Sequence, residues 1–511
     1  MLLIGGGLTL WPHTHRSRAR FPSSPPNRGL PSISALAARV GGDVAPSVGR
    51  LTPCRRPSAL GVVSLSIIAV VVAVLSYAAA VGADTMWLVA LGNEIASRRA
   101  IPVGVPFLDA DTSHWVNVPV LGELVLAGAN GLGPWGLLTL QLLAVAATLV
   151  LLAQTATRLG ARDAAVGVTL LLFVVGGASS LGLVRAQTLS LPCFAVLLLL
   201  LRREQIMPSR LVWFVPVITL VWGNLHGAVL MGVAVAGCYL LFSRARRQPP
   251  TAVAVTVAML ASLWATPGGL RTHVYYWDVL NNAAARRGEG LWTPLSMSSI
   301  FDVALVVTVL VLLGLALSRW LPLWEYVALG GLLIATVQTS RHGVWLLMVL
   351  VPSAARHLGR LLPGLARDRH LAHLPAVLAV VAAGLAVPGV IVRSAAVAAD
   401  AREAQLLAAK IGSNQSTLAP SPLAESLAVA GVRLWAGNPI DALPQNRQAA
   451  YLDFLAAPQR FAPSVAHAPA RVVLKATQQP SQWVEAHYRL GVQERTYLIY
   501  TQVGHGLAHH E

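Results

Sequence analysis

The side chains best suited to chemistry stand in a polar stretch between two long apolar runs. Asp84 follows directly on the first apolar run, and Asp109 and Asp111 come after a turn rich in proline and glycine. Carboxylates in such places can ligate a divalent cation or take the proton from an attacking hydroxyl group. For Asp109 and Asp111 plain solvation in a loop is an alternative, whereas an acid at the end of an apolar run needs a reason to be there.

Two short polar turns farther along offer cations. Arg185 begins the run Arg-Ala-Gln, and Arg341 begins the run Arg-His-Gly that leads into another apolar segment. Guanidinium presents a planar fork of donors that suits phosphate, so we expect Arg185, Arg341 and His342 to bind an anionic lipid headgroup. A plain interfacial charge is the alternative for Arg185.

Aromatic and polar side chains recur in the same connecting segments. Aromatic rings interleaved with polar groups are typical of clefts that bind sugars, although interfacial belts and buried, satisfied histidines use the same residue types. The candidates for substrate contact are Trp87, His114, Trp115, Gln187, Asn224, His226, Trp277, Glu289 and Trp292.

The composition shows what must position these residues. Of the 511 residues 55% are hydrophobic and only 12% are charged, against about 25% charged residues in soluble proteins. This excludes a soluble globular enzyme and indicates a protein that crosses a membrane several times. The three cysteines form no metal-binding pattern, and the arginines are scattered through short loops, so no zinc site, disulfide framework or nucleic-acid partner is expected.

Apolar runs predict about eleven transmembrane helices. We expect them at 60–83, 133–157, 164–184, 187–201, 210–225, 228–243, 251–266, 299–317, 321–339, 343–356 and 374–392.

Charge bias predicts the orientation of these helices. With a cytoplasmic N-terminus, the inner segments collect 21 arginines and the outer segments up to residue 395 collect eight. The positive-inside rule therefore places the N-terminus in the cytoplasm and the end of the eleventh helix outside. All the candidate site residues then share the external face. The Ala-, Arg- and Val-rich, Lys-poor composition indicates the plasma (inner) membrane of a bacterium.

Three regions follow from composition. Residues 1–58 are rich in Pro, Ser and Arg and predict a disordered basic cytoplasmic tail. Residues 59–395 form the transmembrane domain, with a long external loop at 84–132. Residues 396–511 predict a small extracytoplasmic α/β domain, with helices near 402–411 and 446–456 and a terminal hairpin-like pair of strands.

Taken together, these segments resemble the C-type glycosyltransferase superfamily (GT-C), polytopic membrane enzymes related to protein mannosyltransferases. The resemblance covers about residues 60–395 and rests on the order and shared side of its elements. These are Asp84-x-x-Trp87, the run from Pro106 to Trp115, Arg185-x-Gln187, Trp222 to Gly227, Pro267-Gly268 and Arg341-His342-Gly343.

The resemblance implies an inverting transfer of a sugar from a polyprenyl-phosphate donor to a glycan, lipid or protein acceptor of the cell envelope. The catalytic or metal-coordinating carboxylate of the superfamily maps onto Asp84, with Asp109 or Asp111 as a second acid. A divalent cation, Mg²⁺ or Mn²⁺, is the cofactor that this implies. Many members carry two adjacent acids where this chain has Asp84-Thr85, so the metal requirement stays open.

Two other classes of function remain from the sequence. A transporter for an anionic solute would also use arginines and acids at an outer vestibule, although no internal repeat or broken helix pair is visible. A non-catalytic scaffold of an envelope complex would use the C-terminal domain for docking.

Overall fold

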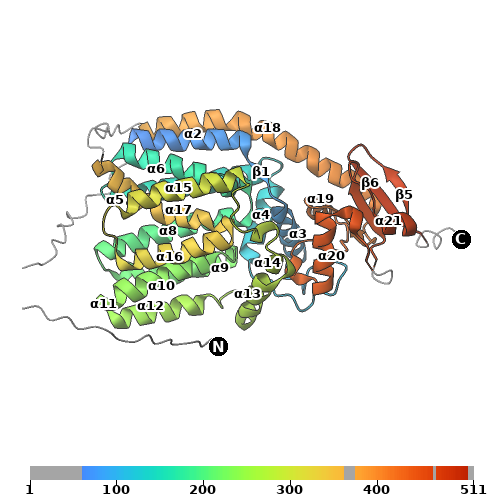
Figure 1. Ribbon diagram of the computed structural model, residues 1–511, viewed down its shortest axis with the longest axis horizontal. Coiled ribbons are helices and arrows are strands. Elements are labelled where there is room, and N and C mark those ends of the chain that lie inside the picture. Colours follow the sequence, from blue (N-terminus) through green and yellow to red (C-terminus); the bar gives the residue numbers. More distant parts are fainter. Residues whose placement is uncertain (1–59, 362–373, 464–467, 504–511) are drawn as a thin grey trace, which may run out of the picture. The chain divides into compact units, whose positions relative to one another are not determined.

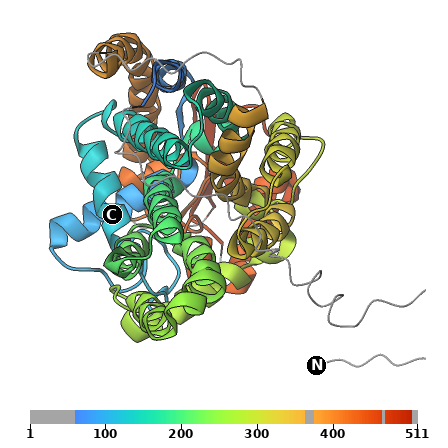
Figure 2. The same cartoon turned by 90° about the vertical axis from the view of Figure 1, so that its left-hand side faces the viewer.

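The computed structural model describes residues 60–361, 374–463 and 468–503; the expected basic tail at 1–58 lies outside these residues. From residue 62 to 361 the chain is dominated by helices that run side by side in a bundle (Figure 1), which Figure 2 shows end-on. The helices of the bundle are α2 (Val62–Ala78), α5 (Gly136–Arg158), α6 (Asp163–Gly176), α8 (Ala186–Ile206), α9 (Phe214–Leu225), α10 (Val229–Tyr239), α12 (Pro249–Ser262), α15 (Ile300–Leu317), α16 (Leu323–Gln338) and α17 (Gly343–Leu361).

The apolar runs account for this bundle. Each expected span contains a helix, and the first half of α18 (Leu374–Ile411) accounts for the last of them. The expected spans 60–83 and 164–184 were too long at their ends, because residues 80–81 and 183–184 form short strands. Leucine, valine and aromatic residues fill the centre, where the ring centroids of Phe194 and Trp345 lie 5.3 Å apart, while residues such as Leu310 are exposed on the outside. Among the described residues, the helices long and apolar enough to cross a membrane are Gly136–Arg158, Ala186–Ile206, Val229–Arg247, Ile300–Leu317 and Val377–Ile411. The protein is therefore a multi-pass helical membrane protein, and the number eleven stays a prediction.

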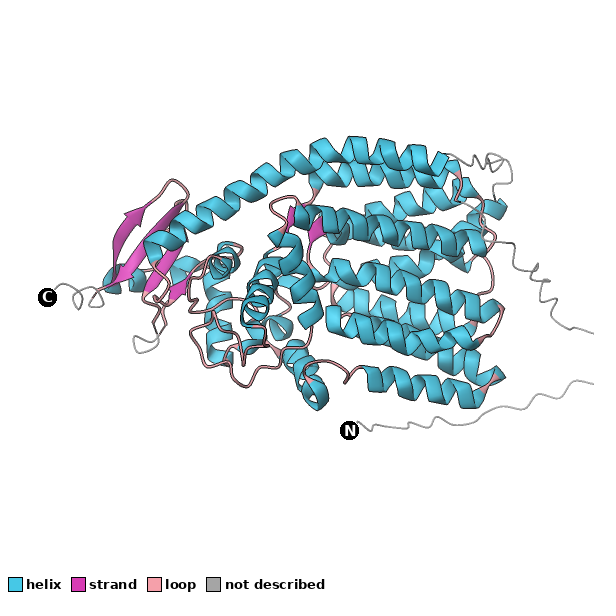
Figure 3. Ribbon diagram, turned by 180° about the vertical axis from the view of Figure 1, so that it is seen from behind, coloured by secondary structure: helices cyan, strands magenta, loops and turns pink. Residues whose placement is uncertain are grey.

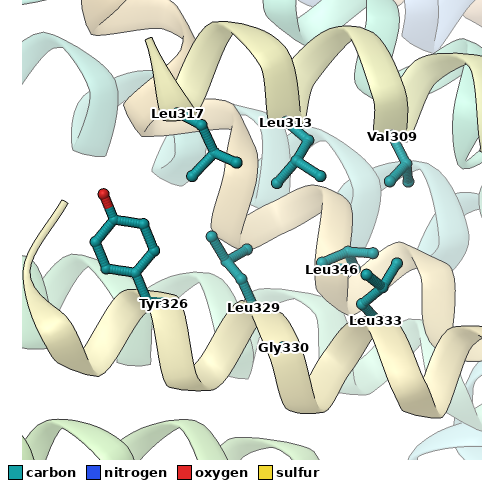
Figure 4. A pocket seen from close by; sticks show the side chains of 8 residues that line it. All are labelled: Val309, Leu313, Leu317, Tyr326, Leu329, Gly330, Leu333 and Leu346. Carbon is teal, nitrogen blue, oxygen red and sulfur yellow. The ribbon is translucent and has the colours of Figure 1, made fainter. Parts of the chain in front are cut away.

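A groove opens between α15 and α16, with a volume of about 150 Å³. Figure 4 shows its side chains facing one another from the two helices. Apart from the hydroxyl of Tyr326 the lining is hydrocarbon, which suits an alkyl or isoprenoid chain. The lining residues are Val309, Leu313 and Leu317 of α15, Tyr326, Leu329, Gly330 and Leu333 of α16, and Leu346 of α17.

A two-stranded parallel sheet ties two helix starts together. β1 (Ala80–Val81) pairs with β2 (Leu183–Val184), and the hydroxyl of Thr85 donates a hydrogen bond of 2.6 Å to the carbonyl of Val184. Because α3 (Ala83–Arg98) follows β1 and α8 follows β2, the N-termini of these two helices lie side by side. We call this end of the bundle the domain end, and the end where α8 and α17 finish the far end.

The stretch expected as an external loop is largely helical. α3 and α4 (Val120–Gly131), of 16 and 12 residues, occupy much of residues 84–132. They lie beside the bundle at its domain end (Figure 1).

The C-terminal residues form the expected small sheet domain. The helix expected near 402–411 is the last part of α18, which continues without a break through Pro388, so the chain passes from the bundle to this domain as one helix. The helix expected at 446–456 is confirmed as α20 (Gln445–Ala456). A four-stranded sheet, magenta in Figure 3, has the order β3-β4-β6-β5, and its antiparallel pair β5–β6 is the expected hairpin. The strands are β3 (Thr417–Leu418), β4 (Arg471–Lys475), β5 (Tyr488–Gln493) and β6 (Tyr497–Gln502).

Candidate active site

Asp84 and Arg185 meet where the small parallel sheet joins two helix starts. Asp84 lies in the first turn of α3, and Arg185 directly precedes α8. A Cβ atom built on Gly82 would lie 2.9 Å from Oδ1 of Asp84, 3.0 Å from the carbonyl oxygen of Val184 and 4.0 Å from Cβ of Arg185. Glycine at position 82 thus leaves room for the carboxylate of Asp84 and the side chain of Arg185 to lie together at the starts of α3 and α8. We call this place the arginine corner. The free N–H groups at helix N-termini favour anions.

A second arginine joins this corner from the connection between α16 and α17. Arg341 lies in the turn η5 (Ser340–His342), and the side-chain amide of Gln187 donates a hydrogen bond of 3.3 Å to the backbone carbonyl of Arg341. The guanidinium carbon of Arg341 lies 4.1 Å from the centroid of the Trp292 ring, a cation–π contact. The fold therefore brings together Arg185, Gln187, Trp292 and Arg341 from three separate segments.

The two arginines lack acidic partners at close range. In the described part of the chain neither Arg185 nor Arg341 has a carboxylate oxygen within 4.0 Å, and Nε of Arg185 is buried without a hydrogen-bond partner. Burial, reinforced by the charge of Arg185, lowers the pKa of Arg341 to about 10. Burial also raises the pKa of Asp84 above its ordinary value, although both arginines oppose this shift. Two mutually repelling cations beside one acid make a place for an anionic ligand.

His226 faces the same corner as a neutral ring. Its Nδ1 lies 3.2 Å from the backbone nitrogen of Ala228 and 3.1 Å from the hydroxyl of Ser190. Because a backbone N–H can only donate, Nδ1 accepts and the ring proton sits on Nε2. Burial lowers the pKa of His226 to about 3, with further contributions from Arg341 and Arg185. The histidine can therefore donate a hydrogen bond without adding a third positive charge.

Comparisons with known proteins bear on this arrangement. No family model and no curated protein sequence matches the chain. Among solved structures, the crystal structure of ArnT from Cupriavidus metallidurans bound to undecaprenyl phosphate superposes with a TM-score of 0.51 and 13% sequence identity, over 87% of this chain and 98% of the ArnT chain. ArnT is a GT-C glycosyltransferase. The chain has the GT-C fold. The similarity confirms the expected polytopic helical fold but not the number of its helices, and at this identity it speaks for the fold alone.

Within this GT-C fold, the other two candidate acids make contacts different from those of Asp84. Asp109 accepts a hydrogen bond of 3.1 Å from the hydroxyl of Ser416 and lies 3.5 Å from Arg433 and 3.8 Å from Arg447, all in the C-terminal domain. Asp111 is exposed and accepts from the backbone N–H of Ser113 in its own turn at 2.9 Å. The contacts of Asp109 and Asp111 therefore lead away from the corner of Asp84.

The aromatic and polar candidates divide into several groups. The indole N–H of Trp115 donates a hydrogen bond of 2.8 Å to Asp441 of the C-terminal domain, and Trp87 packs in the hydrophobic contact between α3 and that domain. Asn224 bonds to the carbonyls of Leu220 and Ala265, which fixes the end of α9.

Four further candidates are exposed or half-buried. His114 is exposed, and its backbone carbonyl accepts from Arg271. Trp277 is 68% exposed, and Glu289 is half-buried in the turn after Gly288. His342 lies next to Arg341, where burial and that charge lower its pKa to about 4.

The structure also shows a buried acid that sequence reasoning did not single out. Glu123, in the first turn of α4, has no exposed surface, and the side-chain amide of Asn117 donates to its Oε2 at 2.8 Å. In the described chain its Oε1 and the amide oxygen of Asn117 have no partner, and burial raises the pKa of Glu123 to about 8. The signal for this residue was an acid inside the apolar start of a helix, Val120-Leu-Gly-Glu-Leu.

The donor set around Asp84 does not fit a divalent cation well. Mg²⁺ and Mn²⁺ take several oxygen ligands, whereas Asp84 is one carboxylate beside two arginines. Among the residues that the structure describes, no three His, Cys, Asp or Glu side chains gather into a metal site. The Mg²⁺ or Mn²⁺ cofactor stays a prediction, and no step below is routed through it.

Proposed function

We propose that the protein is a membrane glycosyltransferase that moves a sugar from a polyprenyl-phosphate donor to an acceptor hydroxyl on the external face, with inversion at the anomeric carbon. The observation that carries this proposal is the pair Arg185 and Arg341, two half-buried guanidinium groups that no carboxylate of the described residues contacts as an ion pair. A phosphate group supplies the negative charge that this pair lacks. The GT-C fold, and the undecaprenyl phosphate bound to ArnT, support a lipid phosphate.

Each residue of the corner has a role in such a transfer. Asp84 takes the proton of the acceptor hydroxyl group while the oxygen of that hydroxyl group attacks the anomeric carbon. The bond from that carbon to the phosphate oxygen breaks, and the phosphate leaves with the electron pair, stabilised by Arg185 and Arg341. His226 can donate its Nε2 proton as a hydrogen bond to the leaving group or the sugar.

The surroundings suit a lipid-linked donor. The isoprenoid chain and the membrane lipids meet apolar helices, including the groove between α15 and α16, while the phosphate stays at the domain end. The proposed location is a bacterial plasma membrane, with the N-terminus in the cytoplasm and the C-terminal domain outside. Its acceptor is a glycan, lipid or protein of the cell envelope.

The test is transfer of radiolabelled sugar by the purified full-length protein. A panel of undecaprenyl- and decaprenyl-phosphate sugars serves as donors, and octyl glycosides serve as soluble acceptors. We expect Asp84→Asn to lower turnover by about a thousandfold, the order of a general base's contribution. The matched variants Asp109→Asn and Asp111→Asn should stay near wild type, because their contacts lie elsewhere.

Two results would overturn the proposal. Folded wild-type protein that releases label from no donor would favour the transporter and scaffold interpretations. Full activity of Asp84→Asn would remove that residue from the role of base. Running each reaction with EDTA and with added Mg²⁺ or Mn²⁺ tests the metal requirement at the same time.

A further inference from the structure

The groove between α15 and α16 lies in the far half of the bundle. α15 runs toward the far end, and its lining residues extend from Val309, in the middle of the helix, to Leu317, its last residue. At 1.5 Å per residue these two positions are roughly 12 Å apart along the helix axis. α16 returns from the far end and contributes Tyr326 near its start and Leu333 farther along. The groove therefore reaches the end of the bundle opposite to the arginine corner.

Gly330 leaves space in the wall of this groove. A Cβ atom built on Gly330 would meet no atom within 4 Å, and the residue is exposed. The side chains of Leu317 and Leu333 are exposed as well. The groove is thus open along its side, where the apolar outer surface of the helices meets the hydrocarbon of the membrane. A flexible lipid chain can enter it from there.

Polar groups stand where the groove reaches the far end. The backbone N–H of Leu321 donates a hydrogen bond of 3.2 Å to the hydroxyl of Tyr326, so the connection between α15 and α16 folds over the start of α16. Figure 4 shows this hydroxyl pointing toward Leu317. Within the described chain the hydroxyl donates no hydrogen bond, and its proton can go to an ester or phosphate oxygen. Trp320 of the same connection is 93% exposed, as is typical of tryptophan at a membrane interface.

The far half of α17 packs against both helices of the groove. Nδ1 of His357 donates a hydrogen bond of 3.0 Å to the backbone carbonyl of Ala316, near the end of α15. One turn earlier, the hydroxyl of Ser353 donates a hydrogen bond of 3.2 Å to Glu325 in the first turn of α16. The last turns of α17 therefore lie at the far end of the groove.

These last turns carry two arginines. Arg356 directly precedes His357 and is half-buried, and Arg360 follows one turn later and is exposed. No carboxylate of the described residues contacts either arginine as an ion pair. A phosphodiester headgroup at the membrane surface supplies the negative charge that matches such cations. Apolar lining and phosphate-binding cations thus meet at one end of the groove.

We propose that the groove between α15 and α16 is a binding site for an anionic glycerophospholipid. One acyl chain lies between the leucines of the two helices, the ester region reaches Tyr326, and the phosphodiester lies at Arg356 and Arg360. The positive-inside rule expects this end on the cytoplasmic side, so the lipid comes from the leaflet opposite to the arginine corner. The bound chain fills space that the protein leaves open and stabilises the packing of α15 on α16.

Native mass spectrometry of the purified full-length protein measures this binding. Phosphatidylglycerol and phosphatidylcholine with identical acyl chains are titrated onto delipidated protein in detergent. Two neighbouring glycines supply a matched pair of variants, because Gly330 lines the groove and Gly331 does not, while a Cβ atom on either would meet no atom within 4 Å. Gly330→Leu should weaken binding of phosphatidylglycerol about tenfold, the worth of about two buried methylene groups. Gly331→Leu should bind like the wild type.

Thermal unfolding gives a second readout. Phosphatidylglycerol should raise the unfolding temperature of the wild type and of Gly331→Leu, because it binds the folded protein. It should not do so for Gly330→Leu, in which the new side chain already occupies the groove.

The headgroup is tested by charge. Arg360→Gln should reduce the preference for phosphatidylglycerol over phosphatidylcholine about fivefold, the effect of one cation at a membrane surface. Arg246→Gln, another exposed arginine at the far end in α11 (Ala245–Arg247), should keep the preference. Because Arg360 is exposed, this variant decides the question if Gly330→Leu does not fold.

Two results would overturn the inference. The first is equal affinity of the wild type, Gly330→Leu and Arg360→Gln for phosphatidylglycerol. The second comes from undecaprenyl phosphate as a competitor. If it displaces phosphatidylglycerol from the wild type and loses as much affinity in Gly330→Leu, the groove belongs to an isoprenoid chain. Binding of undecaprenyl phosphate that Gly330→Leu leaves unchanged would support a separate phospholipid site.

Discussion

Helix α8 carries an arginine near each end, and the two have opposite surroundings. At the far end, Arg202 forms a buried ion pair with Glu325, donates to the hydroxyl of Ser353 at 3.0 Å and lies over the ring of Trp324. At the domain end, Arg185 has no carboxylate within ion-pair distance in the described chain. The Nε of both arginines is buried there without a hydrogen-bond partner, so the ion pair is what distinguishes them. Both arginines belong to one helix, so the difference comes from what packs against each end.

The contrast extends to the other arginines of the bundle. At the far end, Arg244 pairs with Glu204 at 2.9 Å and bonds to the carbonyl of Ser209 and the side chain of Gln248. At the domain end, the guanidinium group of Arg341 lies over the ring of Trp292. A buried cation paired with a carboxylate holds helices together, whereas a cation without such a partner can take an anionic ligand. Each prediction below tests one side of this contrast.

The largest expected effect is on the stability of the far end. Glu325→Ala removes the partner of Arg202 and leaves a buried, uncompensated charge, which should lower the free energy of unfolding by about 3–5 kcal/mol. Thermal unfolding of the detergent-solubilised protein measures this loss. The control is Arg185→Gln, which should unfold at or above the wild-type temperature because a repelling charge is removed. Equal destabilisation by both variants would contradict the claim that only the arginine with a carboxylate partner stabilises the fold.

The next effect is on turnover at the domain end. Arg185→Gln and Arg341→Gln each remove a cation that stabilises the leaving phosphate, and each should reduce single-turnover sugar transfer about 100- to 1000-fold. Binding of undecaprenyl phosphate should weaken in parallel. Arg319→Gln, at the far-end connection between α15 and α16, is the comparison that should leave transfer unchanged. Variants at 185 and 341 that keep full transfer would show that the unpaired arginines serve another purpose.

The smallest effect concerns the unpaired acid at the domain end. Burial raises the pKa of Glu123 in the folded protein from its ordinary value of 4.5 to about 8 and so favours the protonated form. Its contribution to stability is full below pH 4.5 and declines as the pH rises toward 8 and a little beyond. We expect the wild type to lose about 1 kcal/mol between pH 7 and pH 9 relative to Glu123→Gln, which mimics the protonated acid. Unfolding curves that shift equally with pH in the two proteins would contradict this.

Local sequence was sufficient for the helices and for part of the site. Apolar runs form helices in a membrane because only internal hydrogen bonds satisfy the backbone there, so each expected span contains a helix, although the ends of two spans are strands. Asp84, Arg185 and Arg341 stood out because charged groups at the ends of apolar runs are costly without a purpose. The small C-terminal sheet was visible in the alternating runs of residues 471–475 and 496–500.

Only the tertiary structure decided which of these residues meet. The pairing of β1 with β2 brings Asp84 to Arg185 across about a hundred residues, and the partner of Arg202 lies 123 residues away on α16. No local pattern distinguishes Arg185 from Arg202, because a partner's distance depends on packing between helices and leaves no periodicity in the chain. The same holds for Asp441, whose contact with Trp115 spans 326 residues. The sequence by itself determined the membrane helices and the kinds of side chain at their ends, and the packing of those helices determined which of the described charges pair with one another.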